Sequence, residues 1–592
     1  MAAFSAELAE ELIRSSVLGE LVASMRASTL PGHLKACSFV LRCVGAHSAH
    51  LAAACLDLGA APALVHALSH TDSSVREAAA VALAAVVSHS PEAAADALEA
   101  GVAPLLVAAL GEPEPALRRA AAAACADVAK HAPELAAALV DAGALIPLVS
   151  AMRIGVPGAQ SAAAAAALAA ATAAAGAAGA ADVSPAGLAR VRRAATSALC
   201  AFARHTPALA EAVVLARAFP LALVLMRDTD VATRAAAASL VREVVKHSET
   251  LAATVAEAGG VGSCVEFLGT VTSADSGGGG VAVSSSSSSS SSSQIPGGVL
   301  AATLTITPSG SGNGGVGGAL RGTARLPAVM ALGYIAAYSE PLAAAVVAAA
   351  GVSALRDALT DAGAEEHARS AAVWALGQVG KHSAACARAI ANADILRLLL
   401  ALASASPAQV GDDVREKARR ALLAIVSQCD AIPALVALIP ACPPREAVKV
   451  LAQLAALLGT DAGRRRDFLA SGALKLIQRA DPAARAASAT HGSAATREFV
   501  ANSALASGAT SVDAFFAPPF ATTAFATVAA GAPDVDLEES VAVINDLFPA
   551  DVVAHCRPDY GLNLLARAAN DAKALAMDAG GKVARNNNNT DT

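Results

Sequence analysis

Histidine recurs in this sequence in one context, usually behind a basic or small residue and in front of Ser or Thr. Its copies are His47, His89, His131, His205, His247 and His382. Histidine can act as a general base or bind zinc, but a zinc site needs every ligand within about 2.0–2.3 Å of one ion. Residues one repeat apart in stacked helices lie about 10 Å apart. We therefore predict no catalytic, metal or cofactor site here, and interpret these histidines as structural joints between repeats.

The spacing of the histidines defines the repeat. His47, His89 and His131 follow one another at 42-residue intervals, as do His205 and His247. A period of about 42 residues is typical of armadillo and HEAT repeats, which form helical solenoids. Two longer intervals contain low-complexity sequence, an Ala/Gly tract at about 155–186 and a Ser/Gly tract at about 271–322. We expect these tracts to be disordered insertions in loops between repeats, where added length costs little.

The residue order within a repeat predicts three helices. The first is short, begins behind a capping Ser or Thr and ends at a glycine, which suits a left-handed turn. These glycines are Gly59, Gly101, Gly143 and Gly259. A second apolar helix follows, and an acidic turn then begins a longer third helix whose apolar residues recur every three or four positions. At the end of the third helix, the histidine and the basic residue before it place positive charge near the helix dipole.

The fold class predicted from these patterns is all-α, an armadillo/HEAT-like right-handed α-solenoid of about nine three-helix repeats of ~42 residues with low-complexity loop insertions. The predicted solenoid occupies residues 1–480. A low-complexity insertion at 481–535 precedes a C-terminal helical segment at 536–568, and a disordered tail follows at 569–592.

Composition excludes several classes of protein. Apolar residues make up 55% of the chain but aromatic residues only 3%, so alanine carries the apolar content and favours closely packed helices. A net charge of −7 gives no global attraction for nucleic acid. The ten cysteines show no Cys-x-x-Cys spacing and predict buried free thiols in a reducing compartment. We recognise no signal peptide and no membrane-spanning segment, so we expect a soluble cytoplasmic protein without a membrane partner.

Enzyme signatures are weak. With no convincing strand in the sequence, no Gly-x-Ser-x-Gly elbow stands between a strand and a helix, and no phosphate-binding Gly-x-x-x-x-Gly-Lys-Ser/Thr loop occurs. The glycine-rich run at 312–322 lies in low-complexity sequence. Acidic pairs such as Glu538 and Glu539 suit a solvated face. We predict that the protein is not an enzyme, and an enzyme with a site in the C-terminal region is the least favoured alternative.

Binding through a concave groove built from the third helices is the remaining possibility. Nuclear-import armadillo receptors line this groove with a Trp–Asn ladder, whereas here Trp374 alone occupies the tryptophan position. The residues four before each histidine include no asparagine; they are Cys43, Ala85, Asp127, Ala201, Glu243 and Gln378. Import-receptor function is therefore disfavoured.

Basic side chains are the candidate partner-binding residues. One group is a run of three arginines near the C-terminal end of the array, and the other recurs at the ends of third helices. These residues are Arg464, Arg465, Arg466, Lys130, Lys246 and Lys381. The arginine run suits either a solvated helix start or a docking patch for an acidic surface. The lysines either line one edge of the array or serve the helix dipoles.

Several segments resemble one known family. The stretches RLPAVMALGYIAAYSEPLAAAVV (325–347), AVWALGQVGKHSAACARAI (372–390), VREKARRALLAIVSQCDAIPALVALI (414–439) and VINDLFPADVVAHCRPDYGLNLL (543–565) occur in this order. Their order resembles that of the armadillo-repeat central-apparatus proteins of motile cilia, the sperm-associated antigen 6 family. The chain begins roughly where the family's second repeat would, so we expect either a missing capping repeat or a misassigned start. Tyr338 replaces the usual histidine, which further argues against a catalytic role for the histidines.

The resemblance implies a non-enzymatic scaffold of the axoneme, needed for the stability of one central-pair microtubule and for regulated beating. The implied partners are tubulin and other central-apparatus proteins, with self-association along the lattice as a further possibility. The implied location is the cytoskeleton of a cilium or flagellum. The alternative is a cytosolic armadillo adaptor that binds an extended peptide in its concave groove.

Overall fold

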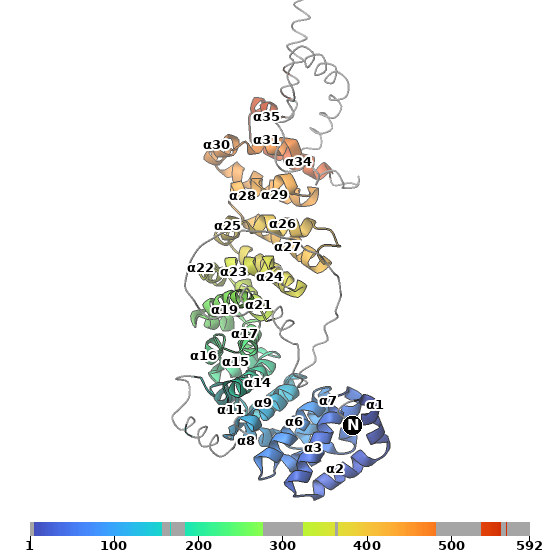
Figure 1. Cartoon of the computed structure of the whole chain (residues 1–592). Coiled ribbons are helices and arrows are strands. Elements are labelled where there is room, and N and C mark those ends of the chain that lie inside the picture. Colours follow the sequence, from blue (N-terminus) through green and yellow to red (C-terminus); the bar gives the residue numbers. More distant parts are fainter. Residues whose placement is uncertain are drawn as a thin grey trace, which may run out of the picture. The chain divides into compact units, whose positions relative to one another are not determined.

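The computed structural model describes residues 5–156, 184–275, 324–361, 365–480 and 534–557, with residues 166, 560 and 564 in isolation (Figure 1). Every element assigned in these residues is helical, which confirms the predicted all-α class. Most of each predicted low-complexity tract, and the whole of the predicted tail, lies outside the described residues. The chain divides into two compact units. The first comprises Met1–Tyr338 with Ala349–Ala371, and the second Ser339–Ala348 with Ala372–Thr592.

The first unit is built from three-helix repeats. Its helices are α1 (Ala6–Arg14), α2 (Val17–Ala27), α3 (Pro31–Gly45), α4 (Ala49–Asp57), α5 (Ala60–Leu68), α6 (Ser73–Val87), α7 (Pro91–Glu99), α8 (Val102–Gly111), α9 (Pro115–Ala129), α10 (Pro133–Asp141), α11 (Leu145–Met152), α14 (Pro185–Ala203), α15 (Pro207–Leu215), α16 (Ala218–Leu225), α17 (Val231–Val245), α18 (Glu249–Glu257), α19 (Gly260–Asp275), α21 (Leu326–Tyr338) and α23 (Gly351–Thr360).

The second unit continues the same pattern. Its helices are α22 (Glu340–Ala348), most of α24 (Glu366–Gly380), α25 (Ala384–Asn392), α26 (Ile395–Ser404), α27 (Asp412–Gln428), α28 (Ile432–Val436), the 3-10 turn η1 (Ile439–Ala441), α29 (Pro444–Thr460), α30 (Ala462–Ala470), α31 (Ala473–Ala480), α34 (Asp534–Asn545) and α35 (Ala550–Cys556).

The third helices of successive repeats pack side by side. In the first unit α6 lies between α3 and α9, and α14 lies between α9 and α17. Val75, Ala79, Leu83 and Val86 of α6 are fully buried, at the spacing that places them on one side of a helix. Alanine at many contacts lets the helices approach closely, and the core lies between the third helices and the shorter first and second ones.

Hydroxyl side chains begin several first helices by accepting a hydrogen bond from a backbone N–H of the first turn. Ser48 accepts from Leu51, and Ser90 accepts from Ala93. The same contact is made by Thr206, Ser248 and Ser383. In the repeat that begins at α10, Ala132 takes this position and Pro133 is the first helical residue.

The corner between first and second helices adopts a left-handed backbone conformation. Gly59, Gly101, Gly143 and Gly259 all have φ between 82° and 90°. The same corner is occupied by Arg217, Ala350 and Asp394, with φ near 60°. The left-handed turn therefore belongs to the repeat geometry, which imposes it even where the residue has a Cβ and the conformation is unfavourable.

The positions of the inserted segments correct one expectation. The described chain stops after α11 and resumes at α14, and it stops after α19 and resumes just before α21. In both cases the break separates the second from the third helix of one repeat, so the insertions lie within repeats rather than between them. The helix α19 also extends to Asp275, past the expected start of the second insertion.

The C-terminal part of the second unit also differs from expectation. The prediction placed a separate helical segment at 536–568, outside a solenoid that ended at residue 480. Instead α34 packs against α29 as a third helix does against its predecessor, and α30 and α31 supply the first and second helices. The rings of Phe468 in α30 and Phe548 behind α34 stack at 6.0 Å, and Gln478 in α31 donates to Asn545 at 2.6 Å. One further repeat therefore follows, with residues 481–533 again between its second and third helices.

No single helix in the described residues is long and apolar enough to cross a bilayer, although six bent pairs of consecutive helices meet the length and composition requirement together.

Candidate partner-binding surface

Three of the histidines connect neighbouring repeats through backbone carbonyls. His131 donates from Nε2 to Val87 O at 2.8 Å, and Val87 is the last residue of the preceding third helix. His205 donates likewise to Ala129 O, and His247 to Ala203 O, both at 2.7 Å. The acceptors close α6, α9 and α14, whose last carbonyls have no partner within their own helices. Each of these side chains thus reaches back one repeat.

The remaining histidines of this series differ in their exposure and in their hydrogen bonds. His47 is half-buried behind α3, and His89 is exposed. The Nε2 of His382, in the second unit, has no hydrogen-bond partner among the described residues.

His131 does not have the role expected from the sequence, in which a positively charged histidine interacts with the dipole of its own helix. Burial lowers the pKa of His131 below its ordinary value of 6.5, and the hydrogen bond to Val87 opposes this only in part. The side chain is therefore neutral near pH 7. It acts as an N–H donor to the neighbouring helix, because burial disfavours the charged form that a dipole interaction with its own helix would require.

Each of the recurrent lysines contacts a side chain three residues earlier in the chain. Lys130 bonds to Asp127 at 2.7 Å, and Lys381 bonds to Gln378 at 2.6 Å. Lys246 pairs with Glu243 and also donates to Arg204 O at 2.7 Å. The side-chain acceptors lie three residues before the lysine, at the position that asparagine occupies in nuclear-import receptors. These lysines therefore make local contacts at the ends of third helices.

The predicted arginine run does not form one patch. Arg464, Arg465 and Arg466 are consecutive in α30, so successive side chains point about 100° apart around the helix axis. Arg465 is half-buried and donates to Leu458 O at the end of α29. Arg464 lies 3.7 Å from Asp461, and Arg466 is exposed. Only Arg464 and Arg466 keep substantial exposed charge.

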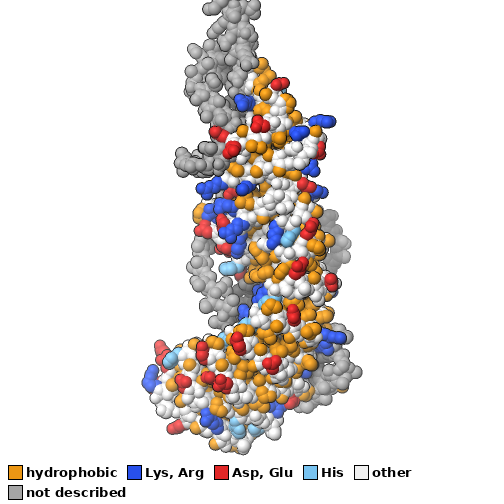
Figure 2. All heavy atoms as spheres, turned by 180° about the vertical axis from the view of Figure 1, so that it is seen from behind, with side chains coloured by type: hydrophobic (Ala, Val, Ile, Leu, Met, Phe, Trp, Pro, Cys, Tyr) orange, Lys and Arg blue, Asp and Glu red, His pale blue; other side chains and the backbone are white. Residues whose placement is uncertain are grey.

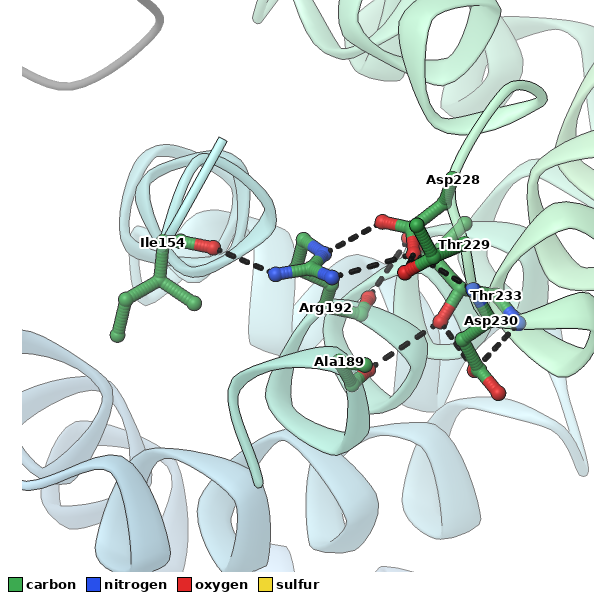
Figure 3. Close-up of polar contacts among 8 residues, drawn as sticks. Ile154, Ala189, Arg192, Asp228, Thr229, Asp230 and Thr233 are labelled. Carbon is green, nitrogen blue, oxygen red and sulfur yellow. Dashed lines mark hydrogen bonds and ion pairs between the residues drawn. The ribbon is translucent and has the colours of Figure 1, made fainter. Parts of the chain in front are cut away.

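An arginine near the start of each of several third helices forms a second joint that the sequence analysis missed. Figure 3 shows Arg192 of α14, whose Nε and Nη2 contact Asp228 at 2.8 and 3.2 Å while Nη1 donates to Ile154 O at 3.0 Å. Ile154 follows the second helix of the same repeat, and Asp228 lies in the next repeat. Thr233, which begins the next third helix, donates to Ala189 O across the same boundary.

Two further ion pairs in the first unit join an arginine to an acidic residue 36 positions later, as Arg192 and Asp228 are joined. Arg76 contacts Glu112 at 3.1 Å and donates to His70 O at the end of its own second helix. Arg325 pairs with Asp361. A signal was present in the sequence, because Arg76–Glu112, Arg192–Asp228 and Arg325–Asp361 share one separation. It was obscured because the acid alternates between Glu and Asp and other repeats lack it.

The exposed face of the third helices around α14 is basic. Arg190, Arg193 and Arg204 lie on one side of α14 and are exposed. No hydrogen bond or ion pair of their side chains is found among the described residues. On the neighbouring helices, by contrast, Arg119 pairs with Glu77 at 3.2 Å. On the face in Figure 2, basic and acidic side chains of the described residues are interspersed among hydrophobic ones.

The described residues hold no group of three His, Cys, Asp or Glu side chains suited to a metal ion. An open cavity of about 200 Å³ lies in the first unit between α19 and α23. Its polar side chains are engaged in structural contacts: Arg325 pairs with Asp361, Asp357 contacts Arg356, and Ser353 donates to Ala350 O. These side chains form no nucleophile–base pair.

Comparison with known proteins shows which repeat and which fold this chain resembles. A model of the armadillo/beta-catenin-like repeat matches residues 48–84, which span α4, α5 and most of α6. An engineered protein of known crystal structure aligns with a TM-score of 0.55 at 22% identity, covering 78% of this chain and 93% of that one. The chain thus has an armadillo-like repeat at residues 48–84 and the fold of an α-solenoid. The predicted α-solenoid is thereby confirmed.

Two relatives support the resemblance found in the sequence. Sperm-associated antigen 6 of Homo sapiens is 36% identical over 114 residues, and sperm-associated antigen 6 of Mus musculus is 38% identical over 114 residues. Each match covers 19% of this chain and 22% of the relative, so the chain spans about a fifth of the length of the relatives that it matches. The chain is thus similar to sperm-associated antigen 6 over 114 residues.

Proposed function

We propose that this protein is a non-enzymatic structural scaffold of the ciliary or flagellar axoneme. In this role it stabilises a microtubule of the central pair and supports motility through contacts between proteins. The similarity to sperm-associated antigen 6 is the observation that carries the proposal. The architecture is compatible with it, since interlocking repeats give a stiff support with a long surface for partners.

The proposed partners are tubulin and other proteins of the central apparatus, with self-association along the lattice as a further contact. Tubulin presents an acidic surface, so contact requires local basic groups on a chain whose net charge is −7. Arg464 and Arg466 are candidates in the second unit. Arg465 is better explained as a support for α29, because its guanidinium donates to Leu458 O.

A cytosolic adaptor that holds an extended peptide in its concave groove is the second candidate. The observation in its favour is the set of exposed arginines on α14, whose side chains have no acidic partner among the described residues.

Localisation of the tagged full-length chain in a motile ciliated cell tests the proposal. We expect a signal along the axoneme that survives extraction with detergent. A diffuse cytosolic or nuclear signal would favour the adaptor and contradict the scaffold.

A further inference from the structure

We propose that the ends of the first helices in the first unit form an acidic edge that binds a basic amphipathic α-helix of a protein partner. In α4, α7, α10, α15 and α18 the last residue lies ten positions after the histidine of its repeat and is exposed. These residues, which define the acidic edge, are Asp57, Glu99, Asp141, Leu215 and Glu257. The proposal does not rest on the proposed function, and it holds for a scaffold or an adaptor.

The first helices carry negative charge and no positive charge. Together α4, α7, α10, α15 and α18 contain nine Asp and Glu residues, all exposed, and no Lys or Arg. The third helices α6, α9, α14 and α17 show the opposite balance, with eight arginines and three acidic residues. Charge in this part of the chain is therefore segregated by helix, and the first helices present a negative surface to a partner.

The acids of the edge stand where their own helices disfavour them. The C-terminal end of a helix carries partial negative charge, so it stabilises a cation and repels a carboxylate. The third helices α9 and α17 follow this rule, with Lys130 and Lys246 at their ends. Four first helices instead end in an acid, and none of them has a basic residue in its last turn.

Contacts within the described part of the chain do not explain these acids. No hydrogen bond or ion pair of the four carboxylates is found among the described residues. Each acid costs its helix stability, yet the acid recurs at the same position in four repeats. Local rules of this kind are broken where a residue serves binding, so the repeated acids point to a partner that supplies the missing positive charge.

The same edge also carries exposed apolar surface. Leu215 is 81% exposed and Ile146 is 77% exposed, the two highest fractions for large apolar side chains in the described part of the chain. Leu215 ends α15, and Ile146 lies just past the corner residue Gly143 of the preceding repeat. Arg217 follows Leu215 at its own corner, so a cation of the partner would be repelled there, whereas an apolar side chain would cover the leucine.

The spacing of the repeats selects a helical partner rather than an extended one. The helices α4, α7 and α10 pack side by side, and stacked helices lie about 10 Å apart. Seven residues of an α-helix advance about 10.5 Å in two turns, so side chains seven positions apart share one face and meet successive acids. An extended chain covers this distance in about three residues, and residues three apart point to opposite sides.

Other ligands fit this edge less well. A metal ion needs oxygen ligands within about 2.6 Å, whereas carboxylates one repeat apart lie about 10 Å from each other. Nucleic acids and anionic membranes are repelled by a negative surface. An acidic protein surface such as that of tubulin is repelled as well, so the acidic edge binds a different partner from the microtubule.

The test uses the full chain and two fluorescein-labelled helical peptides built on Ala and Gln, with binding followed by fluorescence anisotropy. Four positions spaced by seven carry three arginines and one leucine. The leucine is second in one peptide and third in the other, because a helix can lie on the edge in either direction. We expect at least one peptide to bind, with an affinity that falls as salt is raised. Absence of binding by both would overturn the proposal.

A third peptide of the same composition carries its arginines on different sides of the helix. It should bind about tenfold more weakly, because only one of its cations can meet the edge at a time. Equal binding of this peptide would overturn the proposal, since attraction would then depend on net charge alone.

Two triple variants locate the binding surface on the chain. The edge variant neutralises the last residues of three first helices and should bind the peptide about tenfold more weakly; it is Glu99→Gln, Asp141→Asn, Glu257→Gln. The control variant removes the same charge from the first turns of the same helices and should bind as the unaltered chain does; it is Glu92→Gln, Glu134→Gln, Glu249→Gln. Equal losses in the two variants would overturn the proposal.

Thermal denaturation separates binding from a structural role. The edge variant should melt at the same or a higher temperature than the unaltered chain, because it removes carboxylates that the helix dipole disfavours. A lower melting temperature would overturn the proposal, since the acids would then stabilise the fold itself.

The apolar contact is tested with Leu215→Gln. This variant should bind the leucine-containing peptide about tenfold more weakly, and a peptide with Gln in place of its leucine should not distinguish the variant from the unaltered chain. Self-association that disappears in the edge variant would replace the partner helix with a second copy of the chain. Each of these outcomes is independent of where the protein localises in the cell.

Discussion

Arg192 and Asp228 form a buried ion pair with two N–O contacts, of 2.8 and 3.2 Å, across the boundary between two successive repeats. Their side chains are only 8% and 7% exposed. Removing one partner of such a pair leaves an uncompensated charge in a site that water cannot fully reach, which is far more costly than losing a surface pair. The first unit is therefore held together at this boundary by polar as well as apolar contacts.

Asp228→Ala should lower the free energy of unfolding by about 3–5 kcal/mol, because Arg192 stays buried with one carbonyl as its remaining acceptor. Glu266→Ala is the matched control. It breaks the neighbouring pair between Arg227 and Glu266, which is 62% and 47% exposed, and should cost less than about 1 kcal/mol. Urea denaturation followed by circular dichroism measures both changes in the free energy of unfolding. Similar decreases in the two variants would show that the buried pair stabilises the first unit no more than the exposed pair does.

The stability of the first unit should fall as the medium becomes acidic. The pKa of folded His131 lies below its ordinary value of 6.5 because of burial, so the unfolded chain binds the proton more readily. This contribution to stability is complete above pH 6.5 and is lost as the pH falls from 6.5 towards the folded pKa. His131→Gln retains an N–H donor without titrating, and its urea midpoint should depend less on pH than that of the unaltered chain. An unchanged pH dependence would contradict this assignment.

The left-handed corners predict opposite effects for two reciprocal substitutions. Ala350→Gly should stabilise the first unit by about 0.5–1 kcal/mol, because Ala350 has φ 60° and glycine removes the steric cost of its Cβ. Gly101→Ala should destabilise it by about 1 kcal/mol, since φ is 89° and an added Cβ would meet nothing within 4 Å, leaving backbone strain as the cause. Thermal denaturation of the two variants should show midpoints shifted in opposite directions; shifts of the same sign would be inconsistent with backbone strain as the cause.

Glycine within a third helix has a different reason. A Cβ on Gly377 of α24 would lie 2.9 Å from Ala421 Cβ and 3.1 Å from Ala421 Cα in α27. Gly377→Ala should therefore destabilise the second unit by about 1–3 kcal/mol through overpacking, although alanine is normally the better helix former. Gly459→Ala in α29, where nothing lies within 4 Å, should be neutral or stabilising. Equal effects of the two substitutions in urea denaturation would mean that close helix contact is not the cause.

Much of the fold could be predicted from local sequence because the same capping and corner residues recur in many repeats. A capping hydroxyl such as Ser48 and a corner glycine such as Gly59 recur at fixed intervals, so each copy supports the others. Arg217, Ala350 and Asp394 could not be recognised as corner residues, because the backbone there is imposed by packing on neighbouring repeats. Residues 534–545 could not be assigned as a third helix, because a long segment separates them from α31 and hides the period.

The candidate site was harder to predict than the fold. Long-range pairs such as Arg192 with Asp228 become visible only when the repeats are stacked. The run from Arg464 to Arg466 looked like one patch in sequence, but helical geometry spreads its side chains around the axis. The basic face of α14 was missed because Arg190, Arg193 and Arg204 are not consecutive, and because their significance depends on the paired charges of the neighbouring helices.

The connection between the second and third helices of a repeat has a practical use. The ends of these two helices are fixed by packing within the stack, and the length of chain that joins them hardly enters the energy: each doubling costs about 0.6 kcal/mol. Long segments already occupy this connection between α11 and α14, between α19 and α21, and between α31 and α34. A fluorescent protein or an affinity tag inserted there would leave both chain ends untouched. The repeat thus contains its own permissive site for labelling, which can be chosen repeat by repeat.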